Sequence, residues 1–196
     1  MDFLSIIEIL GLLFGILYIV LMIAEKWYSW LFGIVAVTLY GISCYQYKIY
    51  GEMFLQITYV IISLYGIYSW RKNTAKILLI SKLSVNEWFK FIFLGLIIAG
   101  FSFIILIMLQ GAMPILDALT NGFALVATYL AAKKKLGNWI VWVPVNALTI
   151  YMMFSKDMHF YAVLYLLYGL FAILGFYQWQ KTFESQTQEL ESEVSN

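Results

Sequence analysis

Long runs of apolar residues constrain this chain more than any other feature of its sequence. A helix needs about 20 mostly apolar residues to cross roughly 30 Å of hydrocarbon, and runs such as "FIFLGLIIAGFSFIILIML" reach that length several times along the chain. Charged residues make up only 12% of the 196 residues, whereas a soluble domain carries about a quarter. The sequence therefore predicts an all-α membrane protein that crosses the bilayer repeatedly.

Polar interruptions divide the chain into seven predicted transmembrane helices. We expect them at about residues 3–24, 28–47, 52–70, 88–110, 114–132, 138–155 and 160–179. The start "MDFLSIIEIL" has neither a basic segment nor a cleavage site of small residues, so we interpret it as the first span rather than a signal peptide. Residues 181–196 are polar and acidic with almost nothing apolar to bury, which predicts a disordered tail.

The basic residues predict how the helices are inserted. With seven spans, ten of the twelve Lys and Arg residues fall on the side that carries the "KKK" of residues 133–135 and the tail. Only Lys48 and Lys156 fall on the other side. Because basic loops stay in the cytoplasm, we expect the N-terminus outside and the C-terminus inside. We interpret "KKK" as an orientation signal rather than a nucleic-acid or lipid-specific site.

The two ends of the chain contain a repeat. Residues 7–70 align with residues 116–179 without a gap, at a shift of 109. Apolar helices align easily by chance. The evidence for the repeat is therefore the set of rare residue types that match at this one shift. The matched pairs are Trp30 with Trp139, Lys26 with Lys135, Tyr59 with Tyr168, Gly66 with Gly175 and Trp70 with Trp179.

The repeat predicts a 3+1+3 arrangement within a single transmembrane domain, residues 1–180. Three helices form each repeat, and the helix at about 88–110 links them. Both triplets begin on the outer side, so they are parallel repeats related by an axis along the membrane normal. This arrangement is similar to that of SWEET-type sugar carriers, and it predicts a substrate site between the two halves.

The predicted sixth helix carries the clearest candidate site. In "GNWIVWVPVN", residues 137–146, a turn of about 100° per residue places Trp139, Trp142 and Asn146 on one stripe. Indoles stack on a flat ring, and a carboxamide hydrogen-bonds to its polar edge. The alternatives are interfacial anchoring for Trp139 and helix packing for Asn146, whose amide is costly in lipid without a partner.

Three other helices supply further candidates for the same site. Gln56 and Tyr59 share a face of the third helix, Asn121 lies in the fifth, and Tyr168 lies in the seventh. Aromatic stripes also serve ordinary helix packing, but amides in three of the helices favour a polar pocket.

Other kinds of function find little support in the sequence. No Lys, Arg or His falls in the middle of a predicted span, and the acids within spans, Glu8 and Asp117, lie near the outer ends, so a buried proton or sodium relay is not expected. The single His159 cannot form a metal cluster by itself, and Cys44 is the single cysteine. We expect no catalytic residues, metal, cofactor or nucleic-acid partner.

Taken together, these motifs resemble the PnuC-type vitamin transporters, whose best-known members carry nicotinamide riboside. The resemblance covers about residues 8–180. It rests on "ATYLAAKKKLGNWIVWVPVN" followed by "YAVLYLLYGLFAILGFYQW", and on "LQITYVIISLYGIYSW" in the first half. The pattern N-W-x-x-W-x-x-x-[ND] is its most specific part.

The resemblance implies a lipid-embedded homotrimer in the bacterial inner membrane that works by facilitated diffusion for NAD biosynthesis. Cytoplasmic kinases then trap the imported vitamin as its phosphate. The binding residues that it implies are Gln56, Tyr59, Asn121, Trp139, Trp142, Asn146 and Tyr168.

Two departures from the family pattern leave the cargo open. Many relatives have aspartate where Asn146 stands, and "KDMHFYAVLY" departs from the commoner glycine-containing form. Relatives of similar appearance carry thiamine or riboflavin, so these vitamins are the alternatives to nicotinamide riboside. A third possibility, from a different class, is a non-transporting membrane scaffold whose aromatic stripes serve only packing.

Overall fold

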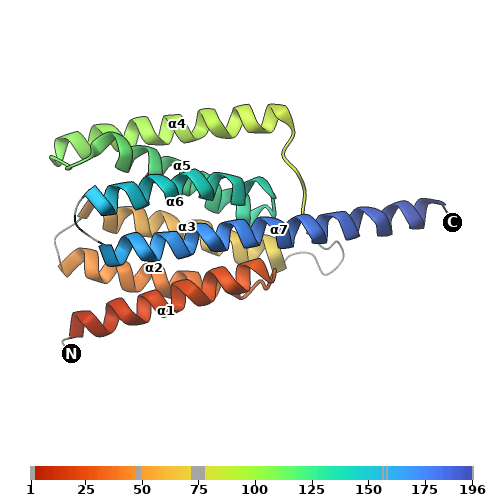
Figure 1. Cartoon of the computed structure of the whole chain (residues 1–196), viewed down its shortest axis with the longest axis horizontal. Coiled ribbons are helices and arrows are strands. Elements are labelled where there is room, and N and C mark those ends of the chain that lie inside the picture. The colour runs from red at the N-terminus through yellow and green to blue at the C-terminus, as the bar shows by residue number, and fades with distance from the viewer. Residues whose placement is uncertain (1–2, 47–49, 72–77, 156, 158, 196) are drawn as a thin grey trace.

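The computed structural model describes residues 3–46, 50–71, 78–155, 157 and 159–195. Over these residues it is helical almost throughout (Figure 1). The helices are α1 (Phe3–Ile23), α2 (Ser29–Gln46), α3 (Tyr50–Arg71), α4 (Val85–Met108), α5 (Pro114–Ala132), α6 (Gly137–Ser155) and α7 (His159–Ser195). Four of the basic residues used to predict orientation, Lys48, Lys72, Lys76 and Lys156, lie outside the described residues.

Neighbouring helices in the sequence are also neighbours in space. Helix α2 packs between α1 and α3, and α6 packs between α5 and α7. Contacts of α3 with α5 and of α1 with α7 join the two groups, and α4 packs on α5 at one edge of the bundle (Figure 1). We call α1–α3 the first half and α5–α7 the second half.

Five of the helices are long and apolar enough to cross a membrane by length and composition. Within the described residues these are α1, α2, α4, α5 and α7. Helices α3 and α6, which were also predicted as spans, are not among them. Both carry amide and aromatic side chains of the predicted site, and these lower their hydropathy.

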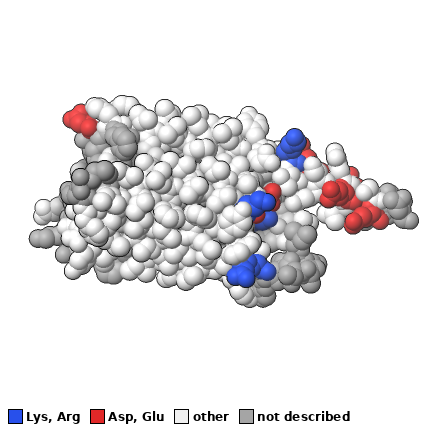
Figure 2. Space-filling view, turned by 90° about the horizontal axis from the view of Figure 1, so that it is seen from below, with Lys and Arg blue, Asp and Glu red and all other residues white. Residues whose placement is uncertain are grey.

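Charged side chains are concentrated at the ends of the bundle. In Figure 2 the long middle of the visible face carries no charge, and the Lys and Arg side chains lie at the end from which α7 projects. We call this the basic end; it carries Lys26, Arg71 and Lys133–Lys135. An apolar middle without charges, between charged ends, matches a lipid environment, in which exposed charges are costly.

The C-terminal tail differs from the sequence-based expectation. Helix α7 continues unbroken to Ser195 and projects beyond the other helices (Figure 1). Phe183 packs against the buried cluster at the basic end, and the Oε1 of Gln186 accepts a 3.2 Å hydrogen bond from the backbone N of Ile80. The tail therefore has contacts that its polar composition did not predict.

Two tryptophan rings lie directly on glycines of the neighbouring helix. The ring of Trp30 in α2 covers Gly66 of α3, and the ring of Trp139 in α6 covers Gly175 of α7. A Cβ atom at Gly175 would lie 2.7 Å from the Trp139 ring. Only glycine permits this approach, so these residues set how closely each helix pair packs.

We predict that one methyl group at either glycine destabilises the protein. Gly66→Ala and Gly175→Ala each force an indole out of its place, and overpacking of this kind costs about 1–3 kcal/mol. Thermal unfolding of the detergent-solubilised protein measures the change.

Gly100→Ala is the matched control. Gly100 lies in α4, and a Cβ there would meet nothing within 4 Å, so this variant should gain about 0.5–1 kcal/mol from its better helix propensity. Equal melting temperatures for all three variants would contradict the packing described above.

Candidate functional site

Helix α6 carries three of the predicted site residues on successive turns. Trp139 and Asn146 are buried, with 2% and 4% of their surfaces exposed, and Trp142 is half-buried. Pro144, between them, is exposed on another face of the helix. The stripe predicted from sequence therefore faces the protein.

Trp139 takes part in packing between α6 and α7. Besides covering Gly175, its ring meets Trp179 edge to face at a centroid distance of 5.4 Å and an angle of 87°. Trp30 meets Trp70 in the same way, at 5.7 Å and 88°. The sequence predicts a ligand-binding role for Trp139. This packing agrees only partly with that prediction, because the face of the ring is already covered.

Trp142 and Tyr59 lie against one apolar cluster. The cluster consists of buried side chains of α5 and α6, among them Ala127, Leu130 and Val145, and both aromatic residues pack on it. Trp142 also reaches the cluster that contains Trp139. An indole from the second half and a phenol from the first half thus pack on the same cluster.

Asn146 uses its amide nitrogen within its own helix. Its Nδ2 donates a 2.9 Å hydrogen bond to the carbonyl of Trp142, one turn earlier. Its Oδ1 takes no part in that bond, and it is not among the fully buried, unpartnered polar atoms of the described residues. Across from it lies Gly169 of α7, where a Cβ would be 3.8 Å from the Cβ of Asn146. An amide oxygen beside a glycine can receive a hydrogen bond from a ligand.

The remaining predicted residues lie on other contacts between helices. Gln56 is buried and faces Gly41 of α2, where a Cβ would lie 3.5 Å from its own Cβ. The hydroxyl of Tyr168 reaches Gly15 of α1 across the contact between the halves. Asn121 is half-buried on α5. Tyr59 and Trp142 therefore pack on the same cluster, whereas Gln56 and Asn146 lie against different helices.

Sequence reasoning missed a polar group at the basic end. Lys134 forms an ion pair with Glu25, with 2.8 Å between Nζ and Oε2, and its Nζ lies 4.9 Å from the ring centre of Trp70. Lys133 lies above the stacked rings of Tyr65 and Tyr129, and the Tyr65 hydroxyl that it contacts raises the pKa of Lys133. The repeat shift of 109 already placed Glu25 on Lys134, but "KKK" was interpreted only as an orientation signal.

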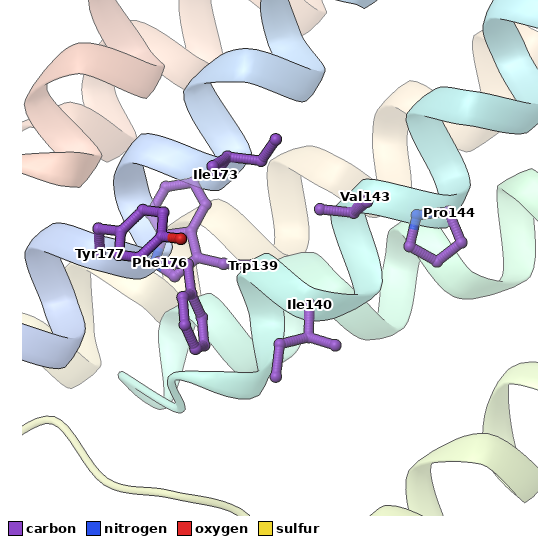
Figure 3. A pocket seen from close by; sticks show the side chains of 7 residues that line it. All are labelled: Trp139, Ile140, Val143, Pro144, Ile173, Phe176 and Tyr177. Carbon is purple, nitrogen blue, oxygen red and sulfur yellow. The ribbon is translucent and has the colours of Figure 1, made fainter.

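An apolar groove of about 440 Å³ lies between α6 and α7. Figure 3 shows Phe176 and Tyr177 of α7 beside Trp139, with Val143 and Pro144 farther along α6. Of the predicted site residues, its lining includes Trp139. Several lining side chains are exposed on the outside of the bundle, so this groove is not the pocket between halves that the sequence predicts.

A solved transporter structure and a family model both match this chain. A crystal structure of the vitamin B3 transporter PnuC superposes with a TM-score of 0.75 and 27% identity, covering 92% of this chain and 83% of that one. The fold is thus that of a multi-helix membrane transporter. The model of the nicotinamide mononucleotide transporter family matches residues 5–181, and the chain belongs to that family.

Two curated relatives support this assignment. The nicotinamide riboside transporter PnuC of Escherichia coli (strain K12) is 24% identical over 204 aligned positions, which cover 90% of this chain and 85% of the relative. The PnuC protein of Neisseria mucosa is 31% identical, over 69% of this chain and 55% of its own length. The resemblance predicted from the sequence is confirmed.

We predict that Trp139 and Asn146 respond oppositely to substitution. Trp139→Ala empties the space above Gly175 and should cost about 3–5 kcal/mol of unfolding free energy. Asn146→Leu removes an amide bonded only within its helix, so stability should stay the same or rise, because residues kept for function often cost stability. Chemical unfolding in detergent measures both; a large loss for Asn146→Leu would assign that residue to packing.

Proposed function

We propose that this chain is a uniporter that imports nicotinamide riboside by facilitated diffusion. The observation that carries the proposal is the similarity to PnuC proteins, which extends over 90% of the chain and is matched by a similar fold. Phosphorylation of the imported vitamin by cytoplasmic kinases then keeps the gradient inward. The proposed location is the inner membrane of a bacterium, and the proposed assembly is a homotrimer.

The proposed architecture is two parallel repeats linked by α4, with the N-terminus outside. Its support is that equivalent residues make equivalent contacts: Trp30 with Gly66 in the first half, and Trp139 with Gly175 in the second. The proposed cytoplasmic side is the basic end, because basic loops are retained in the cytoplasm and the visible Lys and Arg side chains gather there (Figure 2).

The proposed site grips the pyridinium ring from both halves. Trp142 and Tyr59 share one apolar surface, and a cation over an indole gains roughly 0.5–2 kcal/mol. The Oδ1 of Asn146 would accept a hydrogen bond from the carboxamide of the ligand. Gln56, Asn121 and Tyr168 are proposed to line the same path, while Trp139 holds α6 in position for its neighbours.

The proposed transport needs no coupling ion. A coupled carrier usually holds ionisable side chains within its spans, and the middle of each predicted span here lacks Lys, Arg and His. The substrate would therefore move only down its own gradient.

We predict saturable uptake of labelled nicotinamide riboside into liposomes that contain only this protein. Uptake should need no proton or sodium gradient. Trp142→Ala should weaken uptake by roughly tenfold, which corresponds to about 1.4 kcal/mol of lost binding. Phe101→Ala is the control, because Phe101 is 68% exposed on α4 and should leave uptake unchanged.

Competition with thiamine tests the alternative cargo, since thiamine is also an aromatic cation and position 146 carries asparagine here. Unlabelled thiamine in excess should leave uptake of the riboside unchanged. Saturable thiamine uptake without any riboside uptake would replace the cargo and keep the mechanism. A protein that transports neither vitamin, nor riboflavin, would favour the scaffold alternative.

A further inference from the structure

Glu25 and Lys134 hold the same position at the ends of two equivalent helices. Glu25 follows α1 and Lys134 follows α5, and they lie 109 residues apart. Both have left-handed backbones, with φ of 56° and 49°. The residue after each closes the turn alike, because the N–H groups of Lys26 and Lys135 donate to carbonyls five residues earlier. Glycine usually fills this position, so a side chain there carries a conformational cost.

These two side chains bind each other across the two halves of the protein. The Nζ of Lys134 lies 2.8 Å from the Oε2 of Glu25, and their side chains are only 11% and 20% exposed. On the same side, Lys134 lies over the ring of Trp70, at the end of α3. A shielded ion pair of this kind leaves an unpaired charge if either partner is withdrawn. The pair therefore favours one close arrangement of the halves.

Trp179 adds a second polar contact at the same place. Its Nε1 donates to the carbonyls of Met22 and Ile23, at 3.3 and 3.2 Å, in the last turn of α1. Its ring lies 6.0 Å from that of Trp70. The repeat-equivalent indole, Trp70, has a buried Nε1 with no partner among the described residues. The contact between halves is thus asymmetric and centres on the end of α1.

The equivalent turn of the second half, between α5 and α6, is held in place by contacts of its own. We call this turn the α5–α6 corner, and the turn between α1 and α2 the α1–α2 corner. The segment before α4 exchanges backbone hydrogen bonds with the α5–α6 turn: Ser81 N donates to Lys134 O at 3.1 Å, and Leu136 N donates to Ser81 O at 2.9 Å. Lys135 also pairs with Glu87 of α4 at 2.8 Å. For the α1–α2 turn, by contrast, the backbone hydrogen bonds of described residues 24–31 are all local.

We propose that Glu25, Lys134 and Trp179 form a latch that closes the basic end between the two halves. In this proposal, which rests on the proposed transport function, the α1–α2 corner moves and the fastened α5–α6 corner stays in place. When the ion pair and the indole contact break, α1 swings away and the substrate path opens toward the cytoplasm. Alternating access requires such a contact to form and break in every cycle.

Reversible crosslinking tests the latch. In a Cys44→Ala background, Glu25→Cys and Lys134→Cys are joined by a short bis-methanethiosulfonate reagent that dithiothreitol removes. We expect binding of nicotinamide riboside to persist while uptake into liposomes falls at least about tenfold, because a path sealed at one end cannot alternate its access. Reduction should restore uptake.

The matched control joins Glu87→Cys to Lys135→Cys. This pair has the same 2.8 Å separation but lies within the fastened corner, so crosslinking it should leave uptake unchanged. The proposal is overturned if the Glu25–Lys134 crosslink leaves uptake at its original rate. It is equally overturned if both crosslinks reduce uptake to the same extent.

A second measurement does not depend on the cargo. Spin labels on Lys26 and Val85, both exposed, report the distance between the α1–α2 corner and α4. Glu25→Gln should add a longer-distance population, and Glu87→Gln should not. If the uncrosslinked protein carries no riboside, the proposed function fails, and this distance alone decides the latch: no longer population with Glu25→Gln overturns it.

Discussion

The contact of an indole with a bare α-carbon, made once in each half, determines how this bundle is assembled. Trp30 on Gly66 fixes α2 against α3, and Trp139 on Gly175 fixes α6 against α7. Inside a membrane, helices gain nothing from leaving lipid for an equally apolar neighbour, so close packing has to hold them together. Trp70 meets Trp30 edge to face, and Trp179 meets Trp139 in the same way. Trp70 and Trp179 then lie beside each other. One chain of four indoles thereby connects the two halves.

That chain of rings also explains why the sequence predicted so much of the fold. Hydropathy alone predicted helix positions close to those observed. The tryptophans and glycines of the two repeats match at the shift of 109 because each tryptophan contacts one glycine. The substitution of either glycine would disturb that contact, so the residues occur together in both halves. Helix α4, which begins at Val85 rather than at the expected residue 88, starts with a capping box of Ser84 and Glu87.

The site was less predictable, because helical periodicity gives a face and not a neighbour. Periodicity placed Trp139 and Trp142 on one stripe. In the structure the ring of Trp139 lies on Gly175, whereas Trp142 packs on the cluster of α5 and α6. Periodicity also could not pair Glu25 with Lys134. A basic run such as "KKK" is already explained as an orientation signal at a membrane surface. The helical tail escaped prediction for a similar reason: composition does not reveal that Phe183 and Gln186 find partners far away in the sequence.

Helix α7 runs without a break from the interior of the bundle to Ser195. From Trp179 onward it extends about 24 Å at 1.5 Å per residue. Since this rod has no hinge among its described residues, a small change in its tilt becomes a larger displacement at the tip. A fluorophore attached there would act as a pointer, magnifying motions of the second half that are too small to follow near the membrane.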